Sequence, residues 1–598
     1  MSNTMKTING AGFLINPTDS AYTFFPEDFS EEQKMIIETV TDFVETEIYP
    51  NIDKIEKQED NICGTLLKKF GDLGLLSTHM PENLGGMAMD FNTNTIIGDA
   101  VGPSGSFSVA CSAHTGIGML PILYFGTEEQ KKKYLPKLAT GEYKASYCLT
   151  EPSSGSDAMS AKTTAMLTED GKHYILNGQK MWITNAGFAD IFTVFVQVDG
   201  DKFTGVIVER GTKGLSFGAE EKKLGIKGSS TRMVFLEDVK VPIENILGTI
   251  GKGHHIAFNV LNIGRFKLGT SVVGGCKKVT SKSIQYANER KQFKVLISSF
   301  GAIQHKIGEM AIQSFVAESA VYRTSQLINR KINALKEEGQ SFSDSKLNAA
   351  EEYAIECSII KILASEVLDF CVDEGVQIHG GMGYSEEGYI ARAYRDSRIN
   401  RIFEGTNEIN RMVIVNTLLK RAMKGQLDIM TPALAVQSEL KEGKKDESTF
   451  EGAYQSELKA IANYKKALFM VLGTAAKMMM EGNLDLRKEQ ELLMNIADLV
   501  IDIFGLESAI LRVIKINDAK NGNQSIDVYN AVIMAAFYDT NHKIYKTGLD
   551  AIGSFIPEDL QSGYIAGLRQ YTNYPLINVK EMRRKVAEVL IKNNEYCL

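Results

Sequence analysis

The sequence predicts a mainly α-helical protein with a central β domain and a further helical domain towards its C-terminal end. Apolar residues recur at helical spacing from about residue 30 to 145 and from about 251 to 425, and short β-prone runs fill the stretch between them. Helical spacing returns after about residue 453. The 598 residues, 44% hydrophobic and 23% charged, are typical of a multidomain globular protein with a large core.

The expected divisions follow these changes of pattern. They are an N-terminal extension (1–29), an N-terminal helical domain (30–145), a middle β domain (146–250), a helical bundle domain (251–430), a linker (431–452) and an additional C-terminal helical domain (453–598).

Local patterns support each division. Ser30 followed by Gln33 fits a capping box at the start of a helix that runs through Gln33–Tyr49. Ile191–Val198 and Phe203–Val208 are strand-like runs separated by Gly and Asp. The polar, charged stretch at 434–452 predicts a linker, and the apolar stripe within Glu489–Phe504 predicts a helix beyond it.

Charge and cysteine usage narrow the class of protein. The net charge of −8 gives no basic footprint, which argues against nucleic-acid binding. The seven cysteines are irregularly spaced without a CxxC pair, so free thiols in a reducing compartment are expected. The N-terminus has no secretory h-region and no arginine, and no apolar run is seen to reach the length of a membrane span, so a cytoplasmic protein is expected.

Four features of the sequence are candidates for binding or catalysis. The loop in Tyr147–Asp157 (YCLTEPSSGSD) could present N–H groups and hydroxyls to a ligand, or be a plain surface turn. Trp182, the single tryptophan, could pack on a cofactor or in the core. The Gly-rich HGGMG at 379–383 lacks the strand and the acidic partner of a nicotinamide site. Glu404 could be a surface carboxylate, or a base whose pKa is raised by apolar neighbours.

Taken together, YCLTEPSSGSD, WITN (182–185), NERKQF (288–293), QIHGGMG (377–383) and RIFEGTNEIN (401–410) resemble the acyl-CoA dehydrogenase family in their order and spacing. The resemblance covers about residues 30–425. It implies the acyl-CoA dehydrogenase fold: an N-terminal helical domain, a middle β-barrel-like domain and a C-terminal four-helix bundle. The helical region after about 453 resembles the additional domain of the very-long-chain type.

The resemblance also implies bound FAD. The residues expected to contact this cofactor are Tyr147, Leu149, Thr150, Ser156, Trp182, Ile183, Thr184, Thr406 and Glu408 around the flavin, and Arg290, Gln292, Phe293, Gln377, Gly380 and Gly381 at the adenosine diphosphate part of a neighbouring subunit's cofactor. Glu408 replaces a neutral side chain found in some relatives, which leaves its role open.

Glu404 matches the family's catalytic base, which would remove the α-proton while the flavin N5 takes the β-hydride. One branch of the family carries its base elsewhere, at a position that is Gly264 here, and glycine cannot act as a base. Neighbouring Asn262 and Arg265 resemble residues that place the CoA moiety, although Arg265 could instead form a surface ion pair. Ser156 and Gly405 are further substrate contacts expected from the resemblance.

The substrate expected is a long-chain fatty acyl-CoA, because Val109 and Ala113 are small where medium-chain relatives carry bulkier residues. The resemblance further implies a homodimer that passes electrons to an electron-transfer flavoprotein. Two alternatives stay open: an acyl-CoA oxidase that uses oxygen, and a non-catalytic assembly or scaffold protein that keeps the fold. Peripheral membrane contact is only weakly indicated, since Glu439–Glu451 is highly charged without a broad apolar face. No metal site is expected.

Overall fold

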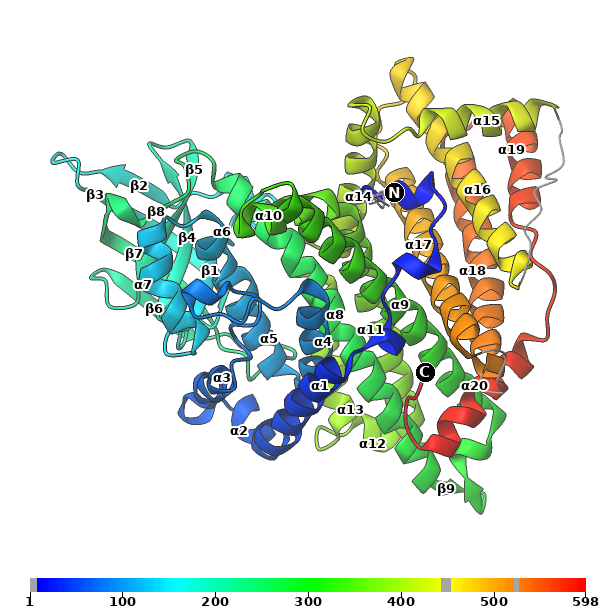
Figure 1. Cartoon of the computed structure of the whole chain (residues 1–598), viewed down its shortest axis with the longest axis horizontal. Helices are drawn as coiled ribbons and strands as arrows, with labels where there is room; N and C mark the ends of the chain where they lie inside the picture. The colour runs from blue at the N-terminus through cyan, green and yellow to red at the C-terminus, as the bar shows by residue number, and fades with distance from the viewer. Residues whose placement is uncertain (1–7, 443–452, 521–525) are drawn as a thin grey trace.

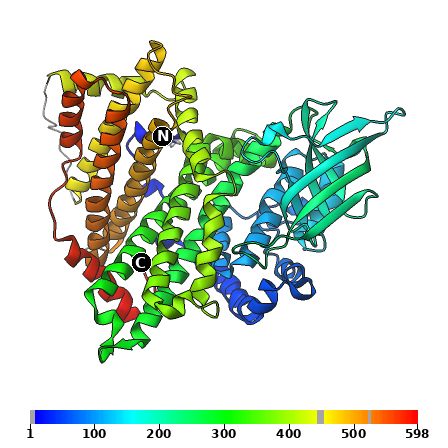
Figure 2. The ribbon, with the colours of Figure 1, turned by 180° about the vertical axis from the view of Figure 1, so that it is seen from behind.

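A computed structural model describes residues 8–442, 453–520 and 526–598 of the chain. Three bodies lie side by side: a lobe of short helices and strands, a central set of long helices, and an outer set of C-terminal helices (Figure 1). The view from behind shows the same order, with the β-sheet at one end and the C-terminal helices at the other (Figure 2).

Short helices form the N-terminal part. They are α1 (Glu31–Phe43), α2 (Ile52–Glu56), α3 (Ile62–Asp72), α4 (Phe91–Val101), α5 (Ser106–Ala113), α6 (Leu120–Phe125) and α7 (Glu128–Ala139). The capping box expected at α1 is present, because Gln33 N donates to Ser30 Oγ and Ser30 N donates to Gln33 Oε1. A π-helical turn, His114–Gly118, joins α5 to α6.

The β domain is one mixed sheet. Its strands are β1 (Ala145–Cys148), β2 (Thr164–Leu167), β3 (His173–Thr184), β4 (Ile191–Val198), β5 (Lys202–Glu209), β6 (Leu215–Glu220), β7 (Thr231–Pro242) and β8 (Ile246–Leu247). The order along the sheet is β6-β7-β3-β2-β4-β5-β8, and β1 pairs in parallel with β4. The run Ile191–Val198 forms a strand because seven of its eight side chains are buried in the sheet core.

Four long helices make the central bundle: α8 (Gly253–Glu289), α9 (Gly301–Glu337), α11 (Ala354–His379) and α14 (Asn407–Met423). Shorter elements connect them, namely the hairpin β9 (Lys291–Gln292) and β10 (Val295–Leu296), and the helices α10 (Phe342–Glu352), α12 (Gly381–Tyr384) and α13 (Tyr389–Ser397). α8 therefore runs from the β domain to the hairpin at the opposite end of the bundle (Figure 1).

The C-terminal helices are α15 (Met430–Glu442), α16 (Gln455–Met480), α17 (Gln490–Lys520), α18 (Ile526–Phe555), α19 (Glu558–Tyr571) and α20 (Val579–Asn593). The linker prediction for 431–452 is wrong in its first half, because α15 occupies Met430–Glu442. α15 packs on α16 with Ala433 and Val436 buried, and Glu439 pairs with Lys466. The charged composition of this segment gave no indication that one face of the helix would be buried. The second half of the predicted linker lies outside the described residues.

The bundle and the C-terminal helices share one hydrophobic core. A single cluster of buried residues includes Val273 of α8, Ile312 of α9 and Ile359 of α11 together with Ile496 of α17 and Val532 of α18. The apolar stripe expected within Glu489–Phe504 faces this core. The additional domain is therefore packed as a continuation of the bundle.

The N-terminal segment that precedes α1 ties these bodies together. The guanidinium of Arg512 on α17 pairs with Glu27 of this segment at 2.7 Å and with Glu318 of α9 at 2.8 Å. The backbone N–H of Ala11 donates to the carboxylate of Glu356 on α11 at 2.6 Å. Burial makes such charge pairs costly to break on one side only.

Two sequence expectations concern solvent and thiols. Ser106–Phe125 is long and apolar enough to cross a membrane by length and composition alone, but 78% of its apolar 18-residue stretch is buried inside the protein, as in a core helix. All seven cysteines are free, and six of them are buried.

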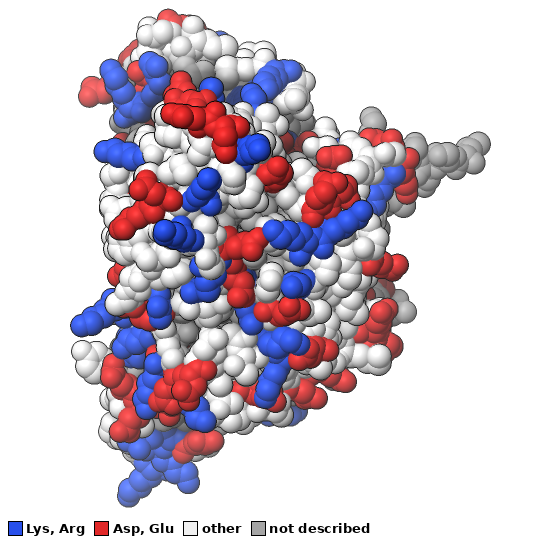
Figure 3. Space-filling view, turned by 90° about the vertical axis from the view of Figure 1, so that its left-hand side faces the viewer, with Lys and Arg blue, Asp and Glu red and all other residues white. Residues whose placement is uncertain are grey.

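On the face that carries the β domain, acidic and basic side chains are interspersed over most of the surface (Figure 3).

Candidate active site

Glu404 lies in the loop between the turn at Arg398–Arg401 and α14. Its backbone adopts the left-handed region with φ 58°, and Gly405 follows with φ 77°. A non-glycine residue in this region is uncommon and is held there by its surroundings. The loop is fixed by Asn410, whose Nδ2 donates to the carbonyl oxygens of Glu404, Gly405 and Thr406.

The Glu404 carboxylate is desolvated. Its Oε2 is buried and has no hydrogen-bond partner among the described residues. Burial raises the pKa of Glu404 to about 7, although the positive charges of Arg265 and Lys361 act to lower it. A carboxylate with a pKa near neutrality suits a general base, because it accepts a proton readily and is still partly ionised.

Gly264 on α8 faces this carboxylate directly. A Cβ atom at Gly264 would lie 2.6 Å from Glu404 Oε2 and 3.0 Å from Cδ, which is closer than real contacts allow. The position at which the resemblance would place an alternative base therefore adjoins Glu404 in space, and the glycine leaves room for the Glu404 side chain.

Arg265 and Asn262 lie on the same helix beside the loop. Arg265 is buried, donates from Nη1 to Asn262 Oδ1 at 2.9 Å, and makes a long contact from Nε to the Glu404 carbonyl at 3.4 Å. The alternative of a surface ion pair for Arg265 is wrong, because the guanidinium is buried and forms no ion pair with a described carboxylate.

The sheet brings a second group of expected residues to this site. Tyr147 on β1 is buried, and burial together with the nearby Glu404 charge raises its pKa well above the usual range. The N–H of Met181 donates to the Thr150 carbonyl, which places Trp182 next to the TEPSSGSD loop. Trp182 has φ 55° at a register shift between β3 and β7 and keeps 60% of its surface exposed.

The loop itself is anchored by a buried ion pair. Lys180 Nζ lies 2.6 Å from Glu151 Oε1, and the carboxylate also accepts from the N–H and hydroxyl of Thr163. Ser156 and Gly155 at the tip are exposed. Glu151 therefore serves to hold the loop, and the tip is left available to a ligand.

The other residues expected at this site differ in exposure. Leu149 and Ile183 are buried, Thr150, Thr184, Gly405 and Thr406 are half-buried, and Glu408 is exposed.

A separate patch lies at the far end of the bundle. It contains the remaining expected residues Arg290, Gln292, Phe293, Gln377, Gly380 and Gly381, all exposed. Phe293 is 88% exposed, and Tyr286 stacks on His379 at 4.3 Å to join the two halves of the patch. Twenty-five residues of α8 separate Arg290 from Arg265, a span of about 37 Å. Within a single chain, this patch therefore lies far from Glu404.

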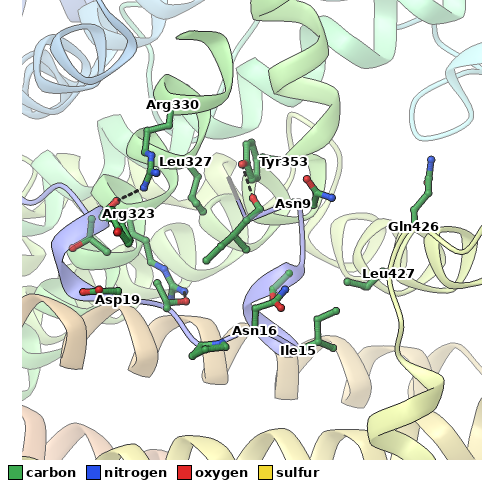
Figure 4. Close-up of a pocket in the computed structure, with 16 residues that line it drawn as sticks. Asn9, Ile15, Asn16, Asp19, Arg323, Leu327, Arg330, Tyr353, Gln426 and Leu427 are labelled. Atoms are coloured by element: carbon green, nitrogen blue, oxygen red, sulfur yellow. Dashed lines mark hydrogen bonds between the residues drawn. The ribbon is translucent and has the colours of Figure 1, made fainter. Parts of the chain in front are cut away.

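Two cavities differ in their relation to Glu404. One of about 90 Å³ is lined by Val109, Ser271, Leu368 and Tyr389 among others, and Ser271 follows Gly264 by two turns of α8. Ala113 does not line it. A larger cavity of about 590 Å³ lies between the N-terminal segment, Arg323 and Leu327 of α9, and Leu427 (Figure 4). None of the expected site residues lines this larger cavity.

Sequence reasoning missed three residues that contact the Glu404 loop or the start of α14. Asn410 and Asn407 lie within RIFEGTNEIN, so the motif contained them without revealing their contacts. Lys361 lies within the helical stretch 349–370 and carries no local signal; its Nζ donates to Asn407 Oδ1 at 2.6 Å. Asn185 of WITN also has an unexpected role, because its Nδ2 donates to the Ala110 carbonyl and fastens α5 to the sheet.

Known proteins were compared with the chain. Models of acyl-CoA dehydrogenase domains match it four times: the N-terminal domain at residues 30–142, the middle domain at 146–239, and C-terminal domains at 251–419 and 463–570. A probable acyl-CoA dehydrogenase of Bacillus subtilis is 44% identical over 589 residues, 98% of each chain. The human mitochondrial very long-chain specific acyl-CoA dehydrogenase is 39% identical over 412 residues, which cover 66% of this chain and 59% of the human protein.

Solved structures agree with these relatives. An acyl-CoA dehydrogenase complexed with FAD from Bacillus anthracis superposes with a TM-score of 0.95 at 44% identity, covering 99% of this chain and all of the other. A prolyl acyl carrier protein oxidase covers 65% of this chain and 99% of its own, with a TM-score of 0.58 and 29% identity. Because the domain models span most of the sequence and a close relative matches it nearly end to end, the chain belongs to the acyl-CoA dehydrogenase family.

Proposed function

We propose that this protein oxidises long-chain fatty acyl-CoA thioesters to trans-2-enoyl-CoA, as a step of fatty acid β-oxidation, with Glu404 as the base. The observation that carries the proposal is Glu404, a half-buried residue whose carboxylate oxygen Oε2 is buried without a partner among the described residues and whose pKa is raised by burial to about 7. Such a group has little structural purpose, because leaving a buried acceptor without a partner costs about 1–3 kcal/mol.

The chemistry requires this environment. The α-hydrogen of a thioester is weakly acidic, so its removal needs a base held close to it and stabilisation of the negative charge that develops on the thioester oxygen. Glu404 would take the proton on its carboxylate. Exclusion of water from the carboxylate strengthens its basicity, and the Asn410 hydrogen bonds hold the loop so that the carboxylate stays aimed at the substrate.

FAD fits the residues near Glu404. Trp182 leaves most of an aromatic side chain exposed beside the TEPSSGSD loop, which is an apolar surface without a protein partner. Thr150, Thr184 and Ser156 supply polar groups around it. When bound there, FAD would supply the acceptor for the β-hydride. The FAD-bound relative from Bacillus anthracis supports this assignment.

The separate patch at β9 and the Gly380 turn supports a homodimer. Phe293 and Tyr384 are each 88% exposed there, and Met382 is also exposed. A Cβ at Gly380 or Gly381 would meet nothing within 4 Å, so the backbone is open to close approach. In the proposed dimer, this patch contacts the adenosine diphosphate part of the cofactor held by the second copy.

The proposed preference for long chains is supported by the cavity at Val109. It begins about 10 Å along α8 from Gly264, which is two helical turns from the base. Its wall near Val109, Val272 and Leu368 is apolar, so it suits the end of a hydrocarbon chain. Substituting Val109→Phe should shorten the preferred chain without changing flavin content.

The electron acceptor proposed is an electron-transfer flavoprotein. The relation to an acyl carrier protein oxidase keeps the oxygen-using reaction as the second candidate, because the fold is common to both. Hydrogen peroxide formed per turnover in air separates the two: stoichiometric peroxide would overturn the dehydrogenase proposal.

The decisive experiment is anaerobic bleaching of the purified flavoprotein with a ladder of saturated acyl-CoAs. Bleaching that is fastest with long chains, and lost in Glu404→Gln although flavin stays bound, is the expected result. A protein that cannot be reconstituted with FAD, or a Glu404→Gln variant that bleaches at the normal rate, would overturn it.

A further inference from the structure

Lys361 on α11 is a fully buried lysine next to the candidate base. Its side chain has no exposed surface, and no described carboxylate forms an ion pair with it. The hydrogen bond it does make is to a neutral group, from Nζ to Asn407 Oδ1 at 2.6 Å. A methionine of similar length would fill the same space without the cost of burying an ammonium, so packing alone does not account for the charge.

Asn407 connects Lys361 to the loop of the base. It is the first residue of α14, three positions after Glu404, and follows Thr406, whose hydroxyl caps the helix by accepting from Ile409 N. The amide Nδ2 of Asn407 donates to Ser365 Oγ at 3.1 Å and to Glu366 Oε1 at 3.0 Å. Ser365 and Glu366 lie one turn further along α11 than Lys361. Residues of α11 therefore bind both the Oδ1 and the Nδ2 of Asn407.

We propose that Lys361 is a positioning residue for Glu404: through Asn407 it fixes the loop that carries the base, and its positive charge favours the ionised carboxylate. The proposal rests on Glu404 being the base. Arg265, the other cation near the carboxylate, reaches the loop from α8, so the two cations approach Glu404 from two different helices.

The charged groups around the pair determine the direction of the effect. Glu404 faces Arg265 of α8, Lys361 of α11 and the Tyr147 hydroxyl of β1. Lys361 faces Glu404, Arg265, Glu408 and Glu366. Burial lowers the pKa of Lys361 to about 7, and the Glu404 charge acts to raise it. Replacing Lys361 with a neutral residue removes one of the two cations that lower the pKa of Glu404, so that pKa should rise.

The test measures kcat/KM for acyl-CoA oxidation against pH, because this ratio reports the pKa of the base in the free enzyme. Lys361→Met removes both the charge and the hydrogen bond. Lys361→Gln removes the charge but keeps a donor for Asn407. Lys346→Met is the matched control: Lys346 of α10 is also buried, its pKa is lowered by burial to about 7, and its Nζ donates to the neutral His79 carbonyl away from Glu404.

Both Lys361 variants should move the acid limb of the profile up by about one pH unit. At pH 7 this shift lowers kcat/KM about fivefold, and the loss should disappear at high pH in Lys361→Gln. Lys361→Met should also show a lower plateau at high pH, because its loop is less firmly held. Lys346→Met should leave the acid limb where it is in the wild type.

Folded, flavin-bound variants with an unmoved acid limb would overturn the proposal. If Lys361→Met shifts the limb and Lys361→Gln does not, the claim about charge is refuted. If Lys361→Met does not fold, Lys361→Gln alone decides. Failure of the proposed function looks different, because then the wild-type flavin itself is not bleached by any acyl-CoA or Glu404→Gln keeps full activity.

Discussion

Gly264→Ala probes the position of the base with a single methyl group. The new Cβ would lie 2.6 Å from Glu404 Oε2 and 3.0 Å from Cδ, whereas comfortable contacts between non-bonded heavy atoms are about 3.5 Å. The carboxylate must therefore retreat by roughly 1 Å. Misplacing a catalytic group by that distance costs on the order of 100-fold in rate.

The effect of Gly264→Ala on the stability of the protein should be small. Alanine is favoured over glycine in a helix interior by about 1 kcal/mol, which offsets part of the steric cost. The expected result is a kcat reduced by one to two orders of magnitude, with normal flavin content and a melting temperature within a few degrees of wild type.

The assay is the rate of anaerobic flavin bleaching at saturating acyl-CoA, with flavin absorbance and thermal unfolding measured on the same preparation. Gly563→Ala is the control, because Gly563 lies in the middle of α19 and a Cβ there meets nothing within 4 Å. It should change neither rate nor flavin content. Wild-type turnover in Gly264→Ala would refute the assigned position of Glu404 and, with it, the role of that carboxylate as base.

Three further predictions concern the pH dependence of activity, the Arg512 ion pairs and the core that the bundle shares with the C-terminal helices. Since the base must be ionised, kcat/KM should fall as the pH drops below about 7, the raised pKa of Glu404; a profile flat down to pH 5 would contradict this. Arg512→Met should destabilise the protein by about 3–5 kcal/mol, measured by denaturant unfolding, because Glu27 loses its ion pair with Arg512 and the buried Glu318 is left with Lys277 as its one cationic partner among the described residues. The exposed Lys546→Met should cost less than about 1 kcal/mol; equal losses would refute the reasoning. A chain truncated after residue 442 should not yield a soluble holoprotein, since it exposes the core shared with α17; a monodisperse, flavin-bound product would show the bundle to be independent.

The resemblance to the acyl-CoA dehydrogenases, read from five short motifs, is confirmed by the domain models and by the relative that matches nearly the whole chain. The fold class is confirmed as well, including the additional helical domain. These predictions succeeded because capping residues, apolar periodicity and motif order are local properties. Ser30 caps α1 through a residue three positions away, and Ile191–Val198 forms β4 from its own composition.

The predicted linker failed for a related reason. Charged composition at 434–452 is local, but the helix at Met430–Glu442 is stabilised by burying Ala433 and Val436 on α16, which lies beyond the gap in the described residues. The composition of a segment does not reveal which neighbour will cover one of its faces.

The sequence by itself determined that Glu404 is the candidate base and that Gly264 could not replace it. Only the tertiary structure decided that Gly264 touches the Glu404 carboxylate, that Lys361 approaches the same loop from α11, and that the Arg290 patch lies about 37 Å from it along α8. The physical reason is that a pKa and a contact depend on burial and on distance between helices far apart in the chain. Those quantities exist only after packing, because a carboxylate surrounded by water in the unfolded chain has no raised pKa.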